Sequence, residues 1–280
     1  MDGWSISSAW LDYDRDGCVD LFIGRYVKFD PKYRNYYAAD NYPGPLDYEA
    51  DTNRLYRNNC NGSFTDLTDK SGLGAFKGRT MGVTAADYDG DGYSDIYVAN
   101  DKTENFLFHN KHDGTFEEIA GDLGVAYGQN GEMTSAMGPI FADVENSGRL
   151  DLWVSDSKYN RLLRNTPRNG FEDITAETGI SALSAQYVSW GSGIFDFALS
   201  KAQASAAWGF STAQMLESAR GTPGFERAPH VVIVAGGLPV FSADGRTRVG
   251  AVGVSGEAPA DDAACAEAGV KAAGLRTSRS

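Results

Sequence analysis

One pattern occurs three times in this 280-residue chain, and a repeat of this length indicates a series of similar structural units. Each copy reads Asn-x-Leu-x-Arg/His-Asn, continues through Gly to Phe, and closes on a Gly-aliphatic step. The copies begin at Asn53, Asn105 and Asn160. Their closing steps are Gly72-Leu73, Gly124-Val125 and Gly179-Ile180.

Acidic loops alternate with these copies, at residues 12–20, 87–95 and 143–151. Runs rich in aromatic and aliphatic residues flank every loop, and each copy of the pattern adds two more runs around an Asn-Gly or Asp-Gly turn. Four short strands in about 50 residues are typical of one β-propeller blade. The predicted fold of residues 1–197 is therefore mainly β, an incomplete β-propeller of about three four-stranded blades. The start of a fourth unit is expected at residues 193–197.

The acidic loops are candidate calcium sites. Carboxylates at positions 1, 3, 5 and 9 converge on one point, Gly at position 6 permits the sharp turn, and the carbonyl at position 7 supplies another oxygen. Carboxylates packed this closely repel one another without a cation, and an oxygen-only ligand set favours Ca²⁺ over zinc or copper. The alternative is a solvated acidic turn. The predicted ligands are Asp12, Asp14, Asp16, Asp20 and the Cys18 carbonyl, then Asp87, Asp89, Asp91, Asp95 and the Tyr93 carbonyl.

The third loop departs from this pattern and leaves a third calcium ion open. Its candidate ligands are Asp143, Glu145, Ser147 and Asp151. Serine offers a neutral and weaker oxygen than aspartate. The sequence therefore predicts two bound Ca²⁺ ions, and for the third loop it does not decide between an ion and a solvated turn.

Residues 1–197 resemble the FG-GAP/VCBS repeats of integrin-type β-propellers through these loops and the Asn-x-Leu-Tyr-Arg-Asn-Asn and Gly-x-Phe-x-Asp-x-Thr strings. Among such proteins they are similar to the bacterial relatives of cartilage acidic protein that carry an ASPIC/UnbV domain. The resemblance implies a calcium-binding, non-enzymatic protein that recognises a protein or glycan. It also implies an extracellular, periplasmic or cell-surface location, although Met1 leads almost directly into a strand without a signal peptide.

Such propellers usually have about seven blades, so three blades leave open sheet edges. Unpaired edges are prone to pair with other chains, and we therefore expect self-association. The net charge of −13 argues against nucleic acid as a partner. No apolar run approaches the ~18 residues of a membrane helix, so no membrane span is expected.

The composition changes near Phe197. Residues 1–196 carry 31 acidic and 17 basic side chains, whereas residues 197–280 carry 7 and 8. The second part, 198–280, is predicted to be a small α/β fragment, formed by a helix, antiparallel strands and a closing helix. The helices are expected at 198–220 and 261–275, and the strands at 230–235, 238–241 and 248–254.

This second part resembles the C-terminal half of the GlcG/HbpS-like family. The matching residues are Lys201-Ala202, Gly236-Gly237-Leu-Pro239, Gly250-Ala-Val-Gly253-Val-Ser255-Gly256, and Asp261-Asp262 with Cys265-Ala266-x-Ala-Gly269. The resemblance implies oligomers and, in some members, binding of haem or corrinoid-related ligands. A haem or small-ligand module is thus the alternative function, with His230 as a candidate haem ligand. About half of that domain has no counterpart here, and the abrupt junction at 197/198 is compatible with a fusion of two truncated genes.

No catalytic triad, phosphate-binding loop or redox metal site stands out, so the sequence predicts no enzyme. Cys18 and Cys60 could form a disulfide in an exported protein, but free thiols are the favoured interpretation because their spacing alone proves nothing. Cys265 is expected on the core-facing side of the closing helix.

Overall fold

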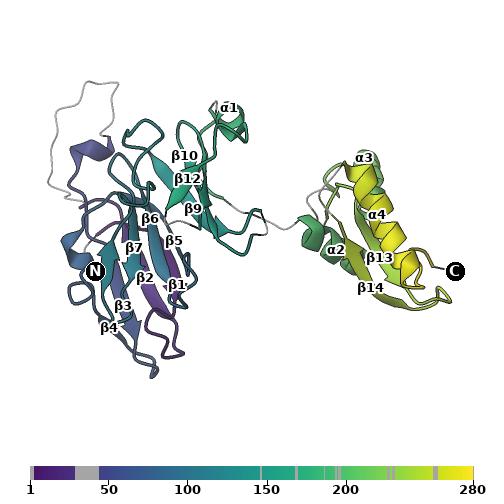
Figure 1. The fold of residues 1–280 in the computed structure, drawn as a ribbon, viewed down its shortest axis with the longest axis horizontal. Helices are drawn as coiled ribbons and strands as arrows, with labels where there is room; N and C mark the ends of the chain where they lie inside the picture. The colour runs from purple at the N-terminus through teal and green to yellow at the C-terminus, as the bar shows by residue number, and fades with distance from the viewer. Residues whose placement is uncertain are drawn as a thin grey trace. The chain divides into compact units, whose positions relative to one another are not determined.

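The computed structural model divides into two compact units, Met1–Gly193 and Ile194–Ser280, which are taken separately (Figure 1). The residues that it describes are 3–28, 44–145, 147–167, 170–185, 187–192, 194, 197–225, 228, 231–254 and 258–279. No helix in these ranges is both long and apolar enough to cross a bilayer.

The first unit contains three four-stranded antiparallel sheets, each with its strands in chain order. Sheet 1 comprises β1 (Ser5–Leu11), β2 (Asp20–Arg25), β3 (Arg54–Asn58) and β4 (Phe64–Asp66). Sheet 2 comprises β5 (Thr80–Ala86), β6 (Asp95–Asn100), β7 (Phe106–Asn110) and β8 (Phe116–Glu118). Sheet 3 comprises β9 (Ala136–Ala142), β10 (Asp151–Asp156), β11 (Arg161–Asn165) and β12 (Phe171–Asp173). The mainly β prediction with three four-stranded units is confirmed.

Short helical elements lie outside the strands of the first unit. The 3₁₀ turn η1 (Pro45–Asp47) precedes β3, η2 (Leu73–Ala75) leads from sheet 1 to sheet 2, and the short helix α1 (Ile180–Ser184) follows sheet 3. The repeated Gly-aliphatic step follows the last strand of each sheet. Its glycines have φ of +85°, +75° and +74°, a left-handed conformation that other residues adopt only with strain. These glycines are Gly72, Gly124 and Gly179.

Sheet 2 is covered on both faces because successive side chains of a strand point to opposite sides. The β6 residues Ile96 and Val98 join a core with sheet 1, while their neighbours Tyr97 and Ala99 join a second core with sheet 3. All six residues of β6 are buried. The first strands of consecutive sheets also contact one another, β1 with β5 and β5 with β9. The three sheets therefore stack as a series.

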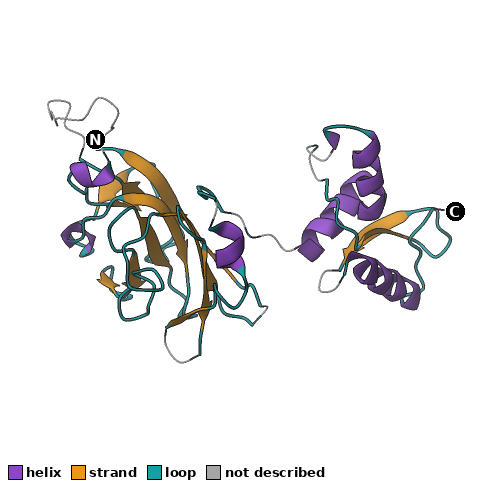
Figure 2. Ribbon diagram, turned by 90° about the horizontal axis from the view of Figure 1, so that it is seen from above, coloured by secondary structure: helices purple, strands orange, loops and turns teal. Residues whose placement is uncertain are grey.

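The second unit is a small α/β region, as predicted, and its helices flank a two-stranded sheet (Figure 2). Its elements are α2 (Phe197–Trp208), α3 (Thr212–Gly221), β13 (Gly237–Phe241), β14 (Arg248–Gly253) and α4 (Pro259–Ala272). Strands β13 and β14 pair antiparallel, and α2 packs on both. The ammonium of Lys201 on α2 lies 2.9 Å from the Asp262 carboxylate on α4, and both side chains are buried.

Three details of this unit differ from expectation. The predicted single helix over 198–220 is broken after Trp208, because Ser211 caps a new helix by accepting a hydrogen bond from the Gln214 amide. The predicted strand over 230–235 is wrong for its described part, residues 231–235, which find no strand partner in the described chain. His230 lies outside the described residues. Cys265 is exposed, whereas α4 turns Asp262, Ala266 and Val270 inward.

Candidate metal-binding loops

The three acidic loops occupy equivalent places, since each joins the first and second strands of its sheet. The ladder of each strand pair runs up to the loop and ends in the pairs Leu11↔Asp20, Ala86↔Asp95 and Ala142↔Asp151. Each loop therefore starts and ends on a hydrogen-bonded hairpin, which fixes the positions of its first and ninth residues.

The first carboxylate of each loop organises the turn. In the first loop, Asp12 accepts hydrogen bonds from the Asp16 amide at 3.1 Å and the Gly17 amide at 3.0 Å. The equivalent residues, Asp87 and Asp143, also accept from the amides at positions 5 and 6. These amide donors hold the pKa of Asp143 below its usual range. The glycine at position 6 has φ between +81° and +92° in all three loops, as the predicted sharp turn requires.

The ninth carboxylate of each loop is buried and braces the hairpin. Asp20 accepts from the Tyr13 amide at 3.2 Å and from the Asn58 amide at 2.7 Å. Asp95 and Asp151 make the same pair of bonds in their own repeats. Burial raises the pKa of Asp95 to about 7. These residues were predicted as metal ligands, and the structure gives each of them a bracing role as well.

The last Asn of the repeated pattern ties neighbouring repeats together. The side-chain amide of Asn110 in sheet 2 donates to the Tyr13 carbonyl in the loop of sheet 1 at 2.8 Å. In the same way, the Asn165 amide in sheet 3 donates to the Tyr88 carbonyl in the loop of sheet 2 at 2.7 Å. Each acidic loop of sheets 1 and 2 is thus held by its own repeat and by the following one.

Replacing this tie is expected to loosen the stack. Asn110→Ala removes the donor to two backbone carbonyls, those of Tyr13 and Ser94. Leaving such groups without a partner costs about 1–3 kcal/mol each, so we expect the free energy of unfolding to fall by about 3 kcal/mol. Urea denaturation measures this loss. Asn130→Ala, at an exposed turn, is the control, and an equal effect of both substitutions would contradict the proposed tie.

Three carboxylates converge in each of the first two loops, at positions 1, 3 and 9 in the first loop and at positions 1, 3 and 5 in the second. Oxygens of Asp12, Asp14 and Asp20 lie within 4.8 Å of one another, and so do oxygens of Asp87, Asp89 and Asp91 in the second loop. The Asp14 Oδ1 atom is buried and has no hydrogen-bond partner. A buried carboxylate oxygen without a donor is unfavourable unless a cation binds it. The donor set of the first two loops therefore fits a hard divalent cation.

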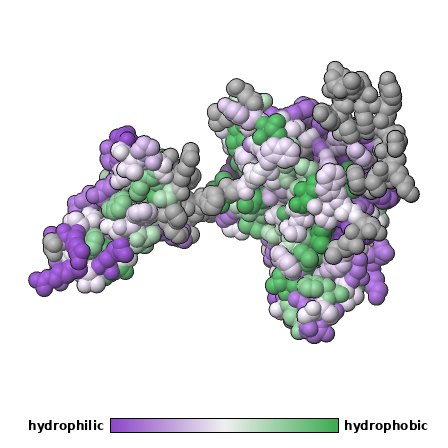
Figure 3. Space-filling view, turned by 180° about the vertical axis from the view of Figure 1, so that it is seen from behind, coloured by the Kyte–Doolittle hydropathy of each residue, from purple (hydrophilic) through white to green (hydrophobic). Residues whose placement is uncertain are grey.

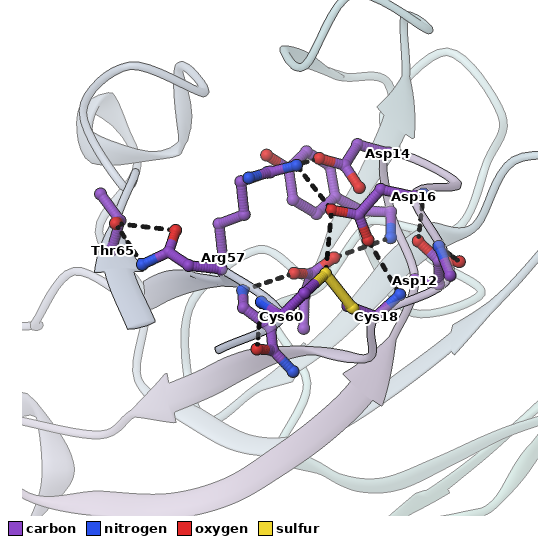
Figure 4. Close-up of polar contacts among 12 residues, drawn as sticks. Asp12, Asp14, Asp16, Cys18, Arg57, Cys60 and Thr65 are labelled. Atoms are coloured by element: carbon purple, nitrogen blue, oxygen red, sulfur yellow. Dashed lines mark hydrogen bonds and ion pairs between the residues drawn. A yellow bond between two sulfur atoms is a disulfide. The ribbon is translucent and has the colours of Figure 1, made fainter. Parts of the chain in front are cut away.

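A basic side chain of the same repeat also approaches each loop. The Arg57 guanidinium lies 2.6 Å from both Asp14 and Asp16, as Figure 4 shows. His109 in sheet 2 takes the equivalent place beside Asp95, at 3.1 Å. Neither contact was predicted from the sequence. The sequence nevertheless contained a signal for a basic residue near each loop, because all three copies of the pattern have Arg or His immediately before their last Asn.

The third loop gathers fewer free oxygens. Arg164, the third residue at this basic position, binds Glu145 through its Nε and Nη2 atoms at 2.6–3.1 Å. Ser147 accepts from the Arg149 amide, and both oxygens of Asp151 accept backbone amides. In the described part of this loop, which lacks Asn146, no three carboxylates converge as they do in loops 1 and 2. Its donor set fits a divalent cation less well.

A disulfide joins Cys18 of the first loop to Cys60 of the β3–β4 hairpin, with the two Cα atoms 5.7 Å apart (Figure 4). The favoured sequence interpretation, free thiols, is therefore wrong. The pairing of β2 with β3 brings the two segments together, although 42 residues separate the cysteines in sequence. The only described free cysteine is Cys265.

Removing this disulfide is expected to destabilise the first unit. A native disulfide typically contributes 2–5 kcal/mol, so Cys18→Ala combined with Cys60→Ala should lower the melting temperature by about 5–15 °C. Thiol titration of the unfolded wild-type protein should find one reactive thiol before reduction and three after it. Three thiols without reductant, in protein purified under oxidising conditions, would contradict the disulfide.

Two protein families match the two parts of the chain. Residues 37–98 and 87–154 match the FG-GAP-like repeat family, and residues 188–271 match the family described as haem degrading protein HbpS-like. The chain thus combines FG-GAP-like repeats, the repeats of recognition and adhesion modules, with an HbpS-like domain. Cartilage acidic protein 1 of Homo sapiens is 29% identical over 146 residues, which are 49% of this chain. The chain covers only 21% of the length of that human protein.

Proposed function

We propose that the first unit is a calcium-stabilised, non-catalytic module that recognises a protein or a glycan outside the cytoplasm. The observation that carries the proposal is the Asp14 Oδ1 atom, buried without a donor among converging carboxylates. A second cluster of the same kind at Asp87, Asp89 and Asp91 supports it. Bound Ca²⁺ would give the Asp14 Oδ1 atom the partner that it lacks, and the loop carboxylates would hold the ion.

The stoichiometry of calcium binding tests this proposal. Protein freed of metal with EDTA is titrated with CaCl₂ in a calorimeter, and we expect two sites per chain. MgCl₂ should bind more weakly, because Mg²⁺ requires a tight octahedral set of ligands. Asp12→Asn with Asp14→Asn should remove one site, and Asp87→Asn with Asp89→Asn the other. The absence of calcium-dependent heat would refute the proposal.

The disulfide supports a location outside the reducing cytoplasm. Disulfides persist in secreted, periplasmic and cell-surface proteins, and Cys18–Cys60 sits on an exposed loop where cytoplasmic thiols would reach it. The recognition partner can be sought with glycan and surface-protein arrays probed in CaCl₂ and in EDTA. A partner bound only in CaCl₂ would support the proposed role. Equal binding in CaCl₂ and in EDTA would show that recognition of the partner does not depend on bound calcium.

We further propose that the first unit self-associates head to tail through its two outer sheets. The cross-strand pairs Ile96–Phe108 and Leu152–Leu163 each pack on the preceding sheet. The equivalent pair in sheet 1, Leu21–Tyr56, has no preceding sheet. Its face also exposes Trp10 and Phe64, and green apolar patches interrupt the surface of the first unit in Figure 3.

The complementary face lies on sheet 3. There the half-buried Trp153 pairs with the buried Leu162, and α1 contacts β11 of the same sheet. Tyr97 and Leu107 hold the equivalent positions in sheet 2, where sheet 3 covers them. The occupant that continues this interface is sheet 1 of a second copy. Light scattering over a range of concentrations should find oligomers, and Trp10→Lys should weaken them. A monomer at every concentration would refute self-association.

A second candidate function is binding of haem or another small ligand by the second unit. The match of residues 188–271 to the HbpS-like family favours it. Haemin added to the full chain should produce a shifted Soret band that saturates at one equivalent. A spectrum identical to that of free haemin would remove this candidate.

A further inference from the structure

A groove of about 570 Å³ opens on the second unit. Its lining includes aromatic rings and guanidinium groups beside Pro239 and the polar side chains of Gln214, Thr277 and Ser278. The rings are those of Trp208, Phe210 and Phe241, and the guanidinium groups are those of Arg246, Arg248 and Arg279. The combination differs from an ordinary apolar pocket, because three cationic groups share one concave surface with the rings.

Three separate segments build the groove. Helix α2 ends at Trp208, and Gly209 then turns the chain with φ of +78°. A Cβ atom at Gly209 would lie 2.5 Å from Nη1 of Arg248, so glycine at this position lets the guanidinium lie against the turn. Phe241 exchanges backbone hydrogen bonds with Arg276 at 2.8 and 3.1 Å, which brings the segment up to Arg279 beside β13.

The groove gathers positive charge. Within the described residues of this unit, no carboxylate forms an ion pair with Arg246, Arg248 or Arg279. By contrast, Arg220 outside the groove pairs with Glu217. The nearby Asp244 carboxylate is already engaged by the Ser242 hydroxyl and the Arg246 amide. Guanidinium groups grouped in this way favour an anion and bind phosphate or carboxylate oxygens in pairs.

The aromatic part of the groove points to a flat ligand. The Trp208 and Phe210 rings meet edge to face with centroids 6.0 Å apart, and Trp208 also contacts Phe225. These contacts hold the Trp208 ring at the rim, where 38% of the residue remains exposed. An exposed aromatic ring beside cationic groups suits a planar ring system that carries negative charge.

We propose that this groove binds a planar aromatic anion, a ring system that carries phosphate or carboxylate groups. The ring of the ligand stacks against the Trp208 and Phe210 side, and its anionic group binds Arg246 and Arg248. The proposal rests on the second candidate function, small-ligand binding by this unit, and gives that function a site and a class of ligand.

Titration of the full chain with flavin mononucleotide tests whether the groove recognises both the planar ring and the anionic group of a ligand. Flavin fluorescence reports binding, riboflavin provides the same ring without the phosphate, and inorganic phosphate provides the anion without the ring. We expect flavin mononucleotide to bind at least tenfold more tightly than either. Arg246→Gln combined with Arg248→Gln should weaken it at least tenfold. Arg220→Gln, outside the groove, should leave binding unchanged.

Haemin, whose anionic groups are carboxylates, forms the second arm of the experiment. Loss of haemin binding in the Arg246→Gln/Arg248→Gln variant, with an unchanged circular dichroism spectrum, supports the groove. If wild type and variant bind haemin equally and flavin mononucleotide does not bind, the groove is not the ligand site. The second candidate function would then still stand. Equal affinity for riboflavin and flavin mononucleotide also overturns it. Failure of both probes refutes the groove and the second candidate together.

Discussion

Saturating calcium is expected to raise the melting temperature of the first unit by about 5–10 °C, and EDTA should reverse the shift. Binding to the folded state alone stabilises it by about 2.7 kcal/mol when the free ion is a hundredfold above Kd. For a unit of this size, 1 kcal/mol shifts the melting temperature by about 2–4 °C. The shift should be large because the ion also relieves repulsion among the carboxylates of loops 1 and 2. Differential scanning calorimetry with and without CaCl₂ measures it.

Loop-specific variants divide this effect between the two sites. Asp87→Asn with Asp89→Asn should abolish about half of the shift, because the first loop still binds its ion. Adding Asp12→Asn and Asp14→Asn should abolish the rest. Glu117→Gln, an exposed carboxylate on β8, is the matched control and should change nothing. A full calcium response in the fourfold variant would show that the ion binds elsewhere.

Lys201→Met is expected to destabilise the second unit by about 3–5 kcal/mol, a large fraction of what so small a unit can have. Lys201 is 1% exposed, and its ammonium bonds to the Asp262 carboxylate and to the Val254 carbonyl, both at 2.9 Å. The substitution leaves a buried carboxylate without its counter-charge. Calorimetry should show the calcium-insensitive transition moving down or disappearing.

Two further variants test that explanation. Lys271→Met is the matched control, because Lys271 is exposed and pairs with Glu267 only across one helical turn, an interaction worth a few tenths of a kcal/mol. Lys201→Met combined with Asp262→Leu should recover much of the loss, since replacing both partners removes the uncompensated charge. Equal destabilisation by Lys201→Met and Lys271→Met would contradict the importance of the buried pair.

Local patterns predicted most of the secondary structure. Short runs rich in aliphatic and aromatic residues beside the acidic loops predicted strands such as β6 and β10 within a few residues, because strand-forming residues and turn residues are neighbours in the sequence. The break in the predicted helix over 198–220 was missed, although its signal is local, because Ser211 and Gln214 form a capping box. The predicted strand over 230–235 was wrong because a strand requires a partner strand, and the hydrophobicity of the segment does not show whether a partner is present.

Contacts between distant residues were beyond the sequence. Pairing of Cys18 with Cys60 depends on the register of β2 against β3, and the approach of Arg57 to Asp14 depends on the same register. The groove on the second unit likewise depends on a turn at Gly209 and a bridge at Arg276 that bring together segments about 30 or more residues apart. Such contacts follow from packing, and packing is a property of the whole unit.

The sequence by itself determined the repeat, the four strands of each repeat, the acidic loops with their glycine turns, and the change of composition near Phe197. All of these follow from short-range periodicity and from the backbone freedom of glycine. Only the tertiary structure decided how the repeats are joined. It showed that Asn110 and Asn165 hydrogen-bond to the acidic loop of the preceding repeat, and that Asp14 has a buried oxygen without a donor. It also showed that the ninth Asp of each loop accepts backbone amides of its own repeat. The physical reason is that burial and hydrogen-bond satisfaction depend on which sheets meet, and separate repeats meet only in the folded chain.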